Sequence, residues 1–151
     1  MEGATYYVTW SLLPGLPKLS PEERDIIVCS IRHFNLDRYD LSAFVVMDDH
    51  VHVLFALRDD WQPNQIIASW KKFTANQLQR QFGRHGRIWR EEYFDRIVRD
   101  ETEFIQKAEY IITNPQRRWP EVSEYLWVWH VGMEESGIRK KSVDGYGDPS
   151  S

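Results

Sequence analysis

The sequence predicts an α+β protein in which helices pack on an antiparallel sheet. Segments rich in β-branched and aromatic residues alternate with longer segments whose apolar residues recur at helical spacing. Two strand-like segments, 41–47 and 50–57, are separated only by Asp48 and Asp49, which is typical of a β-hairpin. The order strand, helix, hairpin, helix, strand, helix favours this fold class.

The first half of the chain begins with a strand and a helix with a clear start. Thr5–Leu12 is rich in β-branched and aromatic residues, and it predicts the first strand. Ser20 suits the N-cap of the next helix, Pro21 suits its first position, and Glu23 completes a capping box. We expect this helix to end near Phe34.

The second half continues with a long helix, a basic loop and a strand. Apolar residues at near-helical spacing predict a helix over 63–82. Residues 83–87 contain two glycines and basic side chains, so they predict a loop. Residues 88–98 set aromatic and branched residues among charges, and we interpret them as a strand.

A third helix is predicted to begin at Asp100, with Glu103 as the reciprocal carboxylate of its cap, and to end at Pro115. Its apolar stripe comprises Phe104, Ile105, Ala108, Ile111 and Ile112. At about 100° per residue, Tyr110 lies nearly opposite the centre of this stripe. Asn114 shares that polar face, because residues four apart are neighbours on a helix.

Length and composition favour one domain. The 151 residues are enough for a proper core, and we assign 1–131 to the domain and 132–151 to a polar, mobile tail. The single cysteine, Cys29, cannot form an internal disulfide, which favours a reducing compartment. No segment resembles a signal peptide, and no apolar run approaches the roughly 20 residues that span a bilayer. We therefore expect a cytoplasmic protein without a membrane partner.

The charge is unevenly distributed. The formal net charge of −4 argues mildly against a nucleic-acid partner. Residues 61–119, however, contain 11 Lys and Arg against 7 Asp and Glu, whereas the rest of the chain is acidic. The second half can therefore form a basic surface or, equally, an ordinary solvated face.

The pattern His50-Val51-His52 is the first candidate for chemistry. Side chains alternate along a strand, so both histidines would point to one face while Val51 points to the other. Two imidazoles at this spacing can hold one metal ion, but further ligands must come from elsewhere. The alternative is a pair of ordinary half-buried polar residues.

Tyr110 and Asn114 form the second candidate. If their helix lay across the histidine strand, Asn114 would supply a third metal ligand, with Tyr110 beside the ion. A phenol with a pKa near 10 is a poor nucleophile at neutral pH, so it needs a base or a Lewis-acid metal. The alternative is a solvated aromatic side chain.

Three segments, 45–52, 89–99 and 110–115, resemble in order and spacing the single-tyrosine transposases of the HUH endonuclease superfamily. The likeness is greatest to the REP-associated tyrosine transposases, relatives of the insertion-sequence-200-like enzymes, and it extends from about residue 5 to 115. The chain departs from the family in three ways. Asp48 stands where proline is common, the overall charge is acidic, and the segment after Pro115 differs.

The resemblance implies a ferredoxin-like antiparallel sheet with helices packed on it and His-x-His on a central strand. It implies that His50, His52 and Asn114 bind Mg²⁺ or Mn²⁺ at the scissile phosphate of single-stranded DNA. Tyr110 would attack the phosphorus and form a 5′-phosphotyrosine link with a free 3′-hydroxyl. A second 3′-hydroxyl would reverse the reaction, so the protein would be an endonuclease and strand transferase that acts on hairpin or repeat DNA.

Eight basic residues are candidates for phosphate contacts: Lys71, Lys72, Arg84, Arg87, Arg96, Arg99, Arg117 and Arg118. Trp70, Trp89 and Trp119 are candidates for stacking on unpaired bases, although a place in the core is the alternative.

Two other functions are compatible with the pattern. One is a host-retained DNA-hairpin-binding protein without catalytic activity, which suits the acidic charge. The other is a nucleotide hydrolase of the histidine-triad type, in which Leu54 would occupy the place of the third histidine. Relatives of this fold include homodimers in which one subunit's tyrosine helix enters the other's site, so the sequence leaves monomer and homodimer open.

Overall fold

The computed structural model describes residues 3–133. Of the predicted tail, residues 134–151 lie outside this range. The elements in chain order are β1 (Thr5–Leu12), α1 (Pro21–His33), β2 (Tyr39–Val46), β3 (His50–Leu57), α2 (Pro63–Phe82), β4 (Trp89–Val98), α3 (Glu101–Arg118) and β5 (Val128–His130). No helix within 3–133 has the length and apolar character that a bilayer crossing needs.

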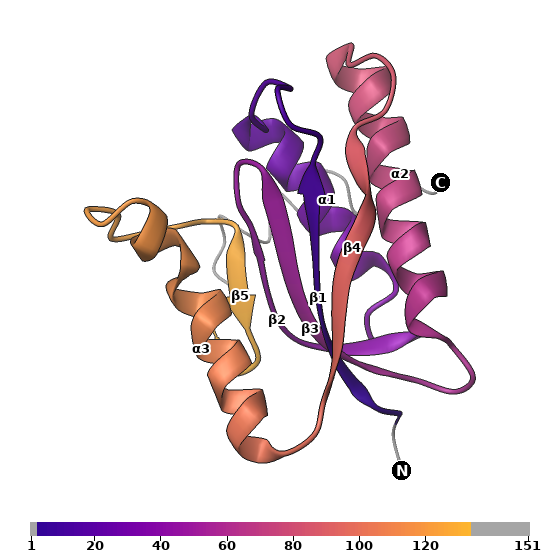
Figure 1. The fold of residues 1–151 in the computed structure, drawn as a ribbon, viewed down its shortest axis with the longest axis vertical. Helices are drawn as coiled ribbons and strands as arrows, with labels where there is room; N and C mark the ends of the chain where they lie inside the picture. Colours follow the sequence, from indigo (N-terminus) through magenta and orange to yellow (C-terminus); the bar gives the residue numbers. More distant parts are fainter. Residues whose placement is uncertain (1–2, 134–151) are drawn as a thin grey trace.

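The strands form one five-stranded sheet in the order β4-β1-β3-β2-β5, and every neighbouring pair is antiparallel. The first four strands with α1 and α2 have the ferredoxin-like arrangement that the sequence predicts, and β3 lies at the centre. Figure 1 shows α1 and α2 on one side of the sheet and α3 on the other. The α+β prediction is confirmed.

Local sequence signals account for the start of α1. The Ser20 hydroxyl accepts a hydrogen bond from the Glu23 amide, and the Glu23 carboxylate accepts one from the Ser20 amide at 2.8 Å. This reciprocal arrangement satisfies two amides that a helix start leaves without partners. The helix then buries Ile27 and Ile31 against the sheet.

Two of the tryptophans considered for base stacking belong to the core under α1 and α2. Trp70 and Trp89 are buried, and their indole N–H groups donate to the Tyr39 hydroxyl at 3.0 Å and the Thr74 hydroxyl at 2.9 Å. Because these rings are covered on all sides, they cannot stack on DNA. Trp119 is half-buried and stacks on Tyr125.

The structure corrects the end and the cap of the third predicted helix. Helix α3 passes through Pro115 to Arg118, since proline removes one hydrogen bond but the Trp119 amide still donates to the Pro115 carbonyl at 2.7 Å. At the start, Asp100 caps the Glu103 amide as predicted. The Glu103 carboxylate, however, accepts from the Arg99 amide instead of completing a capping box.

Helix α3 covers only part of its side of the sheet. It packs over β2, β3 and β5, where Val45, Leu54 and Ile111 are fully buried. Toward β4 this face is less covered, since Tyr7 of β1 still belongs to the cluster under α3 but Phe94 of β4 is exposed. We call the whole face the site face, because it carries His50 and His52.

Candidate active site

The two histidines lie together on the site face, as their alternation predicted. Their ring centroids are 4.7 Å apart, and the rings are perpendicular. His52 sits in the middle of the sheet, opposite Thr9 of β1 on one side and Val45 of β2 on the other. Only 5% of the His52 surface is exposed, whereas His50 is half-buried at the start of β3.

Hydrogen bonds from β1 hold the His52 ring. Its Nδ1 lies 2.8 Å from the Tyr7 hydroxyl and 2.8 Å from the Thr9 hydroxyl, and the ring stacks on Tyr7. On the other side, Asn114 Nδ2 lies 3.5 Å from His52 Nε2. If the amide donates there, Nε2 accepts and Nδ1 carries the proton, so the Nε2 lone pair points toward α3.

His52 is held in its neutral form. Burial, reinforced by the nearby His50 and the positive charge of Arg117, lowers the pKa of His52 from 6.5 to about 3. A neutral imidazole with a lone pair directed toward α3 is the form that binds a metal ion.

His50 is oriented by its neighbour in the turn. His50 Nδ1 lies 2.7 Å from Asp49 Oδ1, and since a carboxylate only accepts, Nδ1 donates; a metal ion would then bind at Nε2. Burial by itself raises the pKa of Asp49, but hydrogen bonds from His50 and Lys18 and the charge of Arg118 outweigh burial and lower this pKa to about 2. Asp49 therefore stays ionised at neutral pH.

Ion pairs tie the end of α3 to the β2–β3 turn. Arg118 lies 2.9 Å from the Asp48 carboxylate and 3.5 Å from that of Asp49, and Lys18 lies 3.2 Å from Asp49 on its other side. These contacts join the helix of Tyr110 to the turn that precedes the histidines. Asp48, the residue that departs from the family's proline, thus has a definite partner.

Tyr110 meets the histidines within one chain. Its ring is edge-on to His52 with centroids 5.5 Å apart, and 46% of the tyrosine surface is exposed. The Arg117 guanidinium lies 4.0 Å from the centre of the Tyr110 ring and donates to the Tyr110 carbonyl at 2.7 Å and the Thr113 hydroxyl at 2.5 Å. Arg117 therefore covers one face of the phenol.

Asn114 lies closer to the sheet than its predicted place on a polar helix face. Only 7% of its surface is exposed, while Ile105 of the predicted apolar stripe is 48% exposed. The face of α3 that packs on the sheet is thus rotated from the one that hydrophobicity alone indicates. This rotation brings the Asn114 amide to His52 and leaves Tyr110 at the edge of the covered region.

The donor atoms fit a divalent metal bound by few protein ligands. Within residues 3–133 no group of three or more His, Cys, Asp or Glu side chains could hold a metal ion. In both histidines Nδ1 is engaged by a neighbour and Nε2 is the nitrogen left for a metal, and turning the Asn114 amide by 180° would present its oxygen in place of its nitrogen. Two imidazoles and one amide leave positions for oxygen atoms of a substrate.

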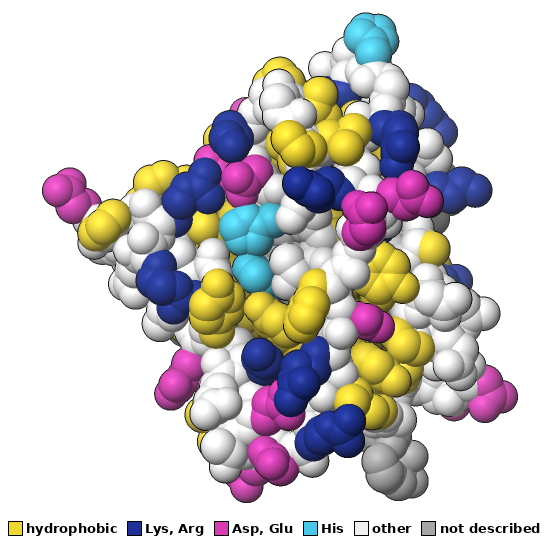
Figure 2. Space-filling model, in the orientation of Figure 1, with side chains coloured by type: hydrophobic (Ala, Val, Ile, Leu, Met, Phe, Trp, Pro, Cys, Tyr) yellow, Lys and Arg dark blue, Asp and Glu magenta, His cyan; other side chains and the backbone are white. Residues whose placement is uncertain are grey.

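Basic side chains surround this site, although not all that the sequence suggested. Figure 2 shows histidines near the centre of the face, hydrophobic side chains directly below them, and Lys and Arg side chains around both. Arg117 lies on the Tyr110 ring, and Arg118 lies at the β2–β3 turn. Arg96 lies on β4 and pairs with Glu103, and Arg99 is exposed at the start of α3.

Three other predicted basic residues lie on the opposite side of the sheet. Lys71, Lys72 and Arg87 line a pocket between α2 and β4. The Lys71 ammonium donates to the carbonyls of Arg90 and Glu91 at 2.8 and 3.0 Å. The structure does not bring these residues to the histidines.

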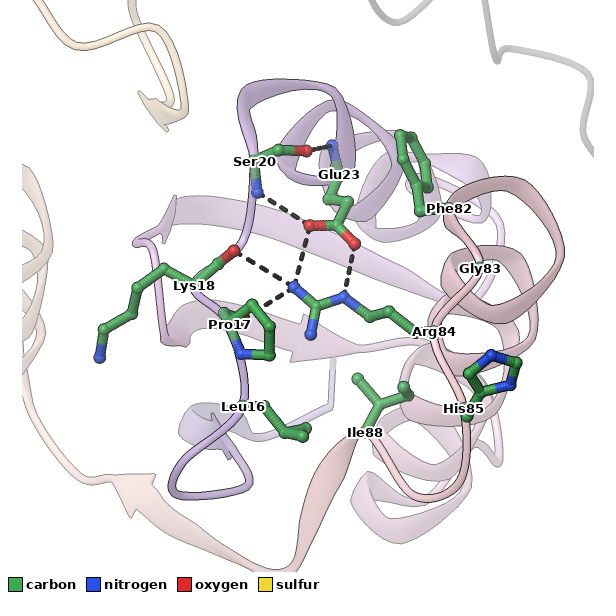
Figure 3. A pocket seen from close by; sticks show the side chains of 10 residues that line it. All are labelled: Leu16, Pro17, Lys18, Ser20, Glu23, Phe82, Gly83, Arg84, His85 and Ile88. Atoms are coloured by element: carbon green, nitrogen blue, oxygen red, sulfur yellow. Dashed lines mark hydrogen bonds and ion pairs between the residues drawn. The ribbon is translucent and has the colours of Figure 1, made fainter.

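Arg84 has a structural place. Figure 3 shows its guanidinium directed at the Glu23 carboxylate in a pocket between the start of α1 and the loop after α2. Arg84 is 2.5 Å from Glu23 and also donates to the carbonyls of Pro17 and Lys18. These partners occupy the guanidinium, and since only 11% of the Arg84 side chain is exposed, it is held within the fold.

Four residues of the site were not predicted. Tyr7 and Thr9 contact His52 only through the pairing of β1 with β3, which no local pattern reveals. Asp49 could have been suspected, because a carboxylate beside a ligating histidine is a recurrent arrangement. Lys107 lies 4.9 Å above the Tyr7 ring, and its spacing of three residues from Tyr110 on the same helix was a usable signal.

Comparison with known proteins identifies the class as a transposase. The sequence profile described as "Transposase IS200 like" matches residues 24–114. The chain belongs to this IS200-like transposase family. No curated protein is significantly similar in sequence.

Solved structures share the fold. One is a REP-associated tyrosine transposase bound to a REP hairpin, with a TM-score of 0.69, 21% identity, and coverage of 85% of this chain and 77% of that chain. Another is a candidate transposase from Deinococcus radiodurans R1, with a TM-score of 0.55, 20% identity, and coverage of 75% and 92%. At these identities the likeness concerns the fold.

Proposed function

We propose that this protein is a metal-dependent endonuclease and strand transferase for single-stranded DNA, with Tyr110 as the nucleophile. The observation that carries this proposal is the meeting of Tyr110, His52 and Asn114 in one chain. The Tyr110 ring is half exposed and lies beside the neutral imidazole of His52, so a phosphodiester can reach its hydroxyl from solvent.

In the proposed reaction the Tyr110 oxygen attacks the phosphorus of a phosphodiester. The new O–P bond joins the tyrosine to the 5′-phosphate, the P–O3′ bond breaks, and the tyrosine hydroxyl loses one proton while the departing 3′-oxygen gains one. The linked phosphodiester conserves the energy of the broken bond, so the 3′-hydroxyl of another strand can reverse the step without ATP. Cleavage and rejoining are one reaction run in two directions.

His50, His52 and Asn114 would hold the Mg²⁺ or Mn²⁺ ion. Bound there, the ion would act as a Lewis acid on the phosphate, which a phenol needs at neutral pH. Asp49 contacts Nδ1 of His50, and Tyr7 with Thr9 contacts Nδ1 of His52, so the Nε2 atom of each ring is left for the ion. These supporting contacts prepare the ligands before the ion arrives.

Arg117, Arg118 and Lys107 would provide the positive charge that DNA needs, despite the net charge of −4. All three belong to α3, so the helix that carries the nucleophile would also contact the strand. By likeness to the hairpin-bound transposase, we propose that the substrate is a DNA hairpin with an unpaired flank. An unpaired strand suits an open sheet face, because its bases are free to turn toward protein side chains.

The test uses end-labelled oligonucleotides that contain a hairpin and a single-stranded flank, incubated with Mn²⁺. The wild-type protein should form a covalent protein–DNA adduct that survives denaturing electrophoresis. Tyr110→Phe should still bind the hairpin but form no adduct, and replacing both His50 and His52 by alanine should abolish cleavage. Tyr93→Phe, which alters another exposed tyrosine, is the matched control and should react like wild type.

A persisting adduct in Tyr110→Phe would overturn the role of this tyrosine. Tight hairpin binding by the wild type without any cleavage in Mn²⁺ or Mg²⁺ would instead favour the host-retained binding protein. Unchanged cleavage by the double-histidine variant, and by the wild type in chelator, would contradict the proposed metal dependence.

A further inference from the structure

We propose that Phe94 is a stacking platform for one unpaired nucleobase of the DNA strand bound at the active site. This inference rests on the proposed function, and it concerns a residue that neither the histidine nor the tyrosine motif includes. It assigns to the less covered part of the site face a role in positioning the substrate.

Strand register places Phe94 in line with the metal-ligand histidine. Thr9 of β1 pairs with His52 of β3 on one side and with Phe94 of β4 on the other. Residues opposite one another across neighbouring strands project from the same face, so His52, Thr9 and Phe94 form a row. Strands lie about 4.8 Å apart, so the backbones of His52 and Phe94 are roughly 10 Å apart. A nucleotide adjoining a phosphate at His52 can span that distance.

Phe94 is exposed where a base would arrive. Its surface is 53% exposed, and it lies outside the buried cluster that α3 forms with the sheet. The Phe94 and Tyr7 rings are inclined at 71°, with centroids 6.2 Å apart. Since Tyr7 is buried and contacts His52, Phe94 has a rigid support on the side of the active site and an open face toward solvent.

An exposed phenylalanine alone would not indicate a ligand, because single surface hydrophobics are common. The charge around Phe94 supplies the second argument. The Lys107 ammonium lies over the neighbouring Tyr7 ring, and Arg96 follows two residues later on the same face of β4. Aromatic rings interleaved with cations are how proteins bind single-stranded nucleic acid, with bases on the rings and phosphates on the cations.

The side chain also predicts what the platform distinguishes. Phenylalanine has no hydrogen-bonding side-chain group. Its affinity for a base therefore depends on the area of the stacked ring and not on the polar groups at the base edge. A purine at the stacked position should therefore bind better than a pyrimidine, and a site without a base should bind worst.

The experiment measures binding by the Tyr110→Phe protein, so that it needs no cleavage. A hairpin oligonucleotide carries an abasic residue that is moved one position at a time through the unpaired flank. Phe94→Ala should weaken binding of the intact oligonucleotide by roughly tenfold. With the abasic residue at one position, Phe94→Ala should cause no further loss. Phe94→Trp should keep wild-type affinity.

Tyr93→Ala is the matched control. Tyr93 is the adjacent aromatic, 37% exposed, but it pairs with Trp10 and points to the opposite face of the sheet. This variant should bind as tightly as the parent protein at every abasic position. A 2-aminopurine at the stacked position should be quenched on binding, and Phe94→Ala should relieve this quenching.

Equal affinity of the Phe94→Ala and parent proteins would overturn the platform, as would a loss that persists undiminished at every abasic position. Both results are independent of catalysis. If the wild type forms adducts normally but Phe94→Ala binds DNA with unchanged affinity, the stacking role of Phe94 is wrong and the proposed endonuclease activity is retained. If no adduct forms but the effect of Phe94→Ala on binding disappears at one abasic position, the proposed endonuclease activity is wrong and Phe94 still belongs to a DNA-binding surface.

Discussion

The two hydroxyl groups that hold His52 should be replaceable one at a time but not together. Tyr7 and Thr9 each place a hydroxyl oxygen 2.8 Å from His52 Nδ1. With the proton on Nδ1, this single N–H group needs only one acceptor. Tyr7→Phe keeps the stacked ring and Thr9→Val keeps the shape, so each variant removes only its hydroxyl.

The expected size of the effect follows from the burial of His52. In either single variant the remaining hydroxyl still accepts a hydrogen bond from the His52 Nδ1–H group. The free energy of unfolding should therefore fall by about 1 kcal/mol or less. The double variant leaves a buried N–H without an acceptor, which costs about 1–3 kcal/mol more. Loss of the contacts that orient a metal-ligating histidine lowers metal affinity or activity by roughly 10- to 100-fold. The double variant should therefore lose more than the two single variants combined.

Urea unfolding of the metal-free proteins measures the stability term, and the Mn²⁺ dependence of adduct formation measures the effect on the site. Thr9→Ser in the Tyr7→Phe background is the matched control, because it restores a hydroxyl and should recover most of the loss. Additive effects, or a double variant within twofold of wild type in its Mn²⁺ requirement, would refute the assigned role of these hydroxyls.

Three further predictions concern the assembly, the metal and the fold. Mixing the His50→Ala/His52→Ala protein with Tyr110→Phe should restore no cleavage, because both halves of the site lie in one chain, whereas recovered activity would require exchange between subunits. Chelation with EDTA should abolish adduct formation and excess Mn²⁺ should restore it, while an adduct rate indifferent to chelator would contradict the metal requirement. Burial raises the pKa of Glu23, but hydrogen bonds from Arg84 and Ser20 outweigh burial and lower this pKa below 4.5. The ion pair therefore stabilises the fold above about pH 4.5, and this stability is lost as the pH falls through the lowered pKa. Glu23→Gln should thus cost about 3 kcal/mol at pH 7 in urea unfolding, with a difference from wild type that shrinks in acid; a difference that grows in acid would contradict this assignment.

Local patterns were sufficient for the elements but not for their contacts. Ser20 and Glu23 specify a helix start within four residues, and alternation places His50 and His52 on one face. These signals depend on near neighbours in the chain. The contacts of His52 with Tyr7 and Thr9 depend on the pairing of β1 with β3, which brings together residues more than forty positions apart.

The errors have the same origin. Periodicity placed Asn114 on a polar face, but α3 is rotated so that Asn114 meets His52 and Ile105 faces solvent. The helix packs on the sheet and pairs with Asp48 through Arg118, and neither of these tertiary contacts is visible along the helix sequence. Likewise, β5 is only three residues long, too short for a recognisable alternation, and it exists because β2 offers it an edge.

The charged residues show most clearly what the sequence alone cannot predict. Arg84 and Arg117 look alike in the sequence, yet one is enclosed by Glu23 and two carbonyls, and the other lies on the ring of Tyr110. Which arginine is available to DNA is decided by tertiary partners. Residue type and spacing therefore select candidates for a nucleophile and for metal ligands, but they do not indicate which charged residues surround them.

The most direct test of the central claim is to locate the DNA on the protein. Wild-type protein is reacted with a hairpin oligonucleotide in Mn²⁺, digested with protease and nuclease, and analysed by mass spectrometry for a peptide that carries a nucleotide. Cleavage through Tyr110 should give a single phosphotyrosine-linked nucleotide, at Tyr110. A link to any other residue, or strand cleavage without a linked peptide, would contradict it.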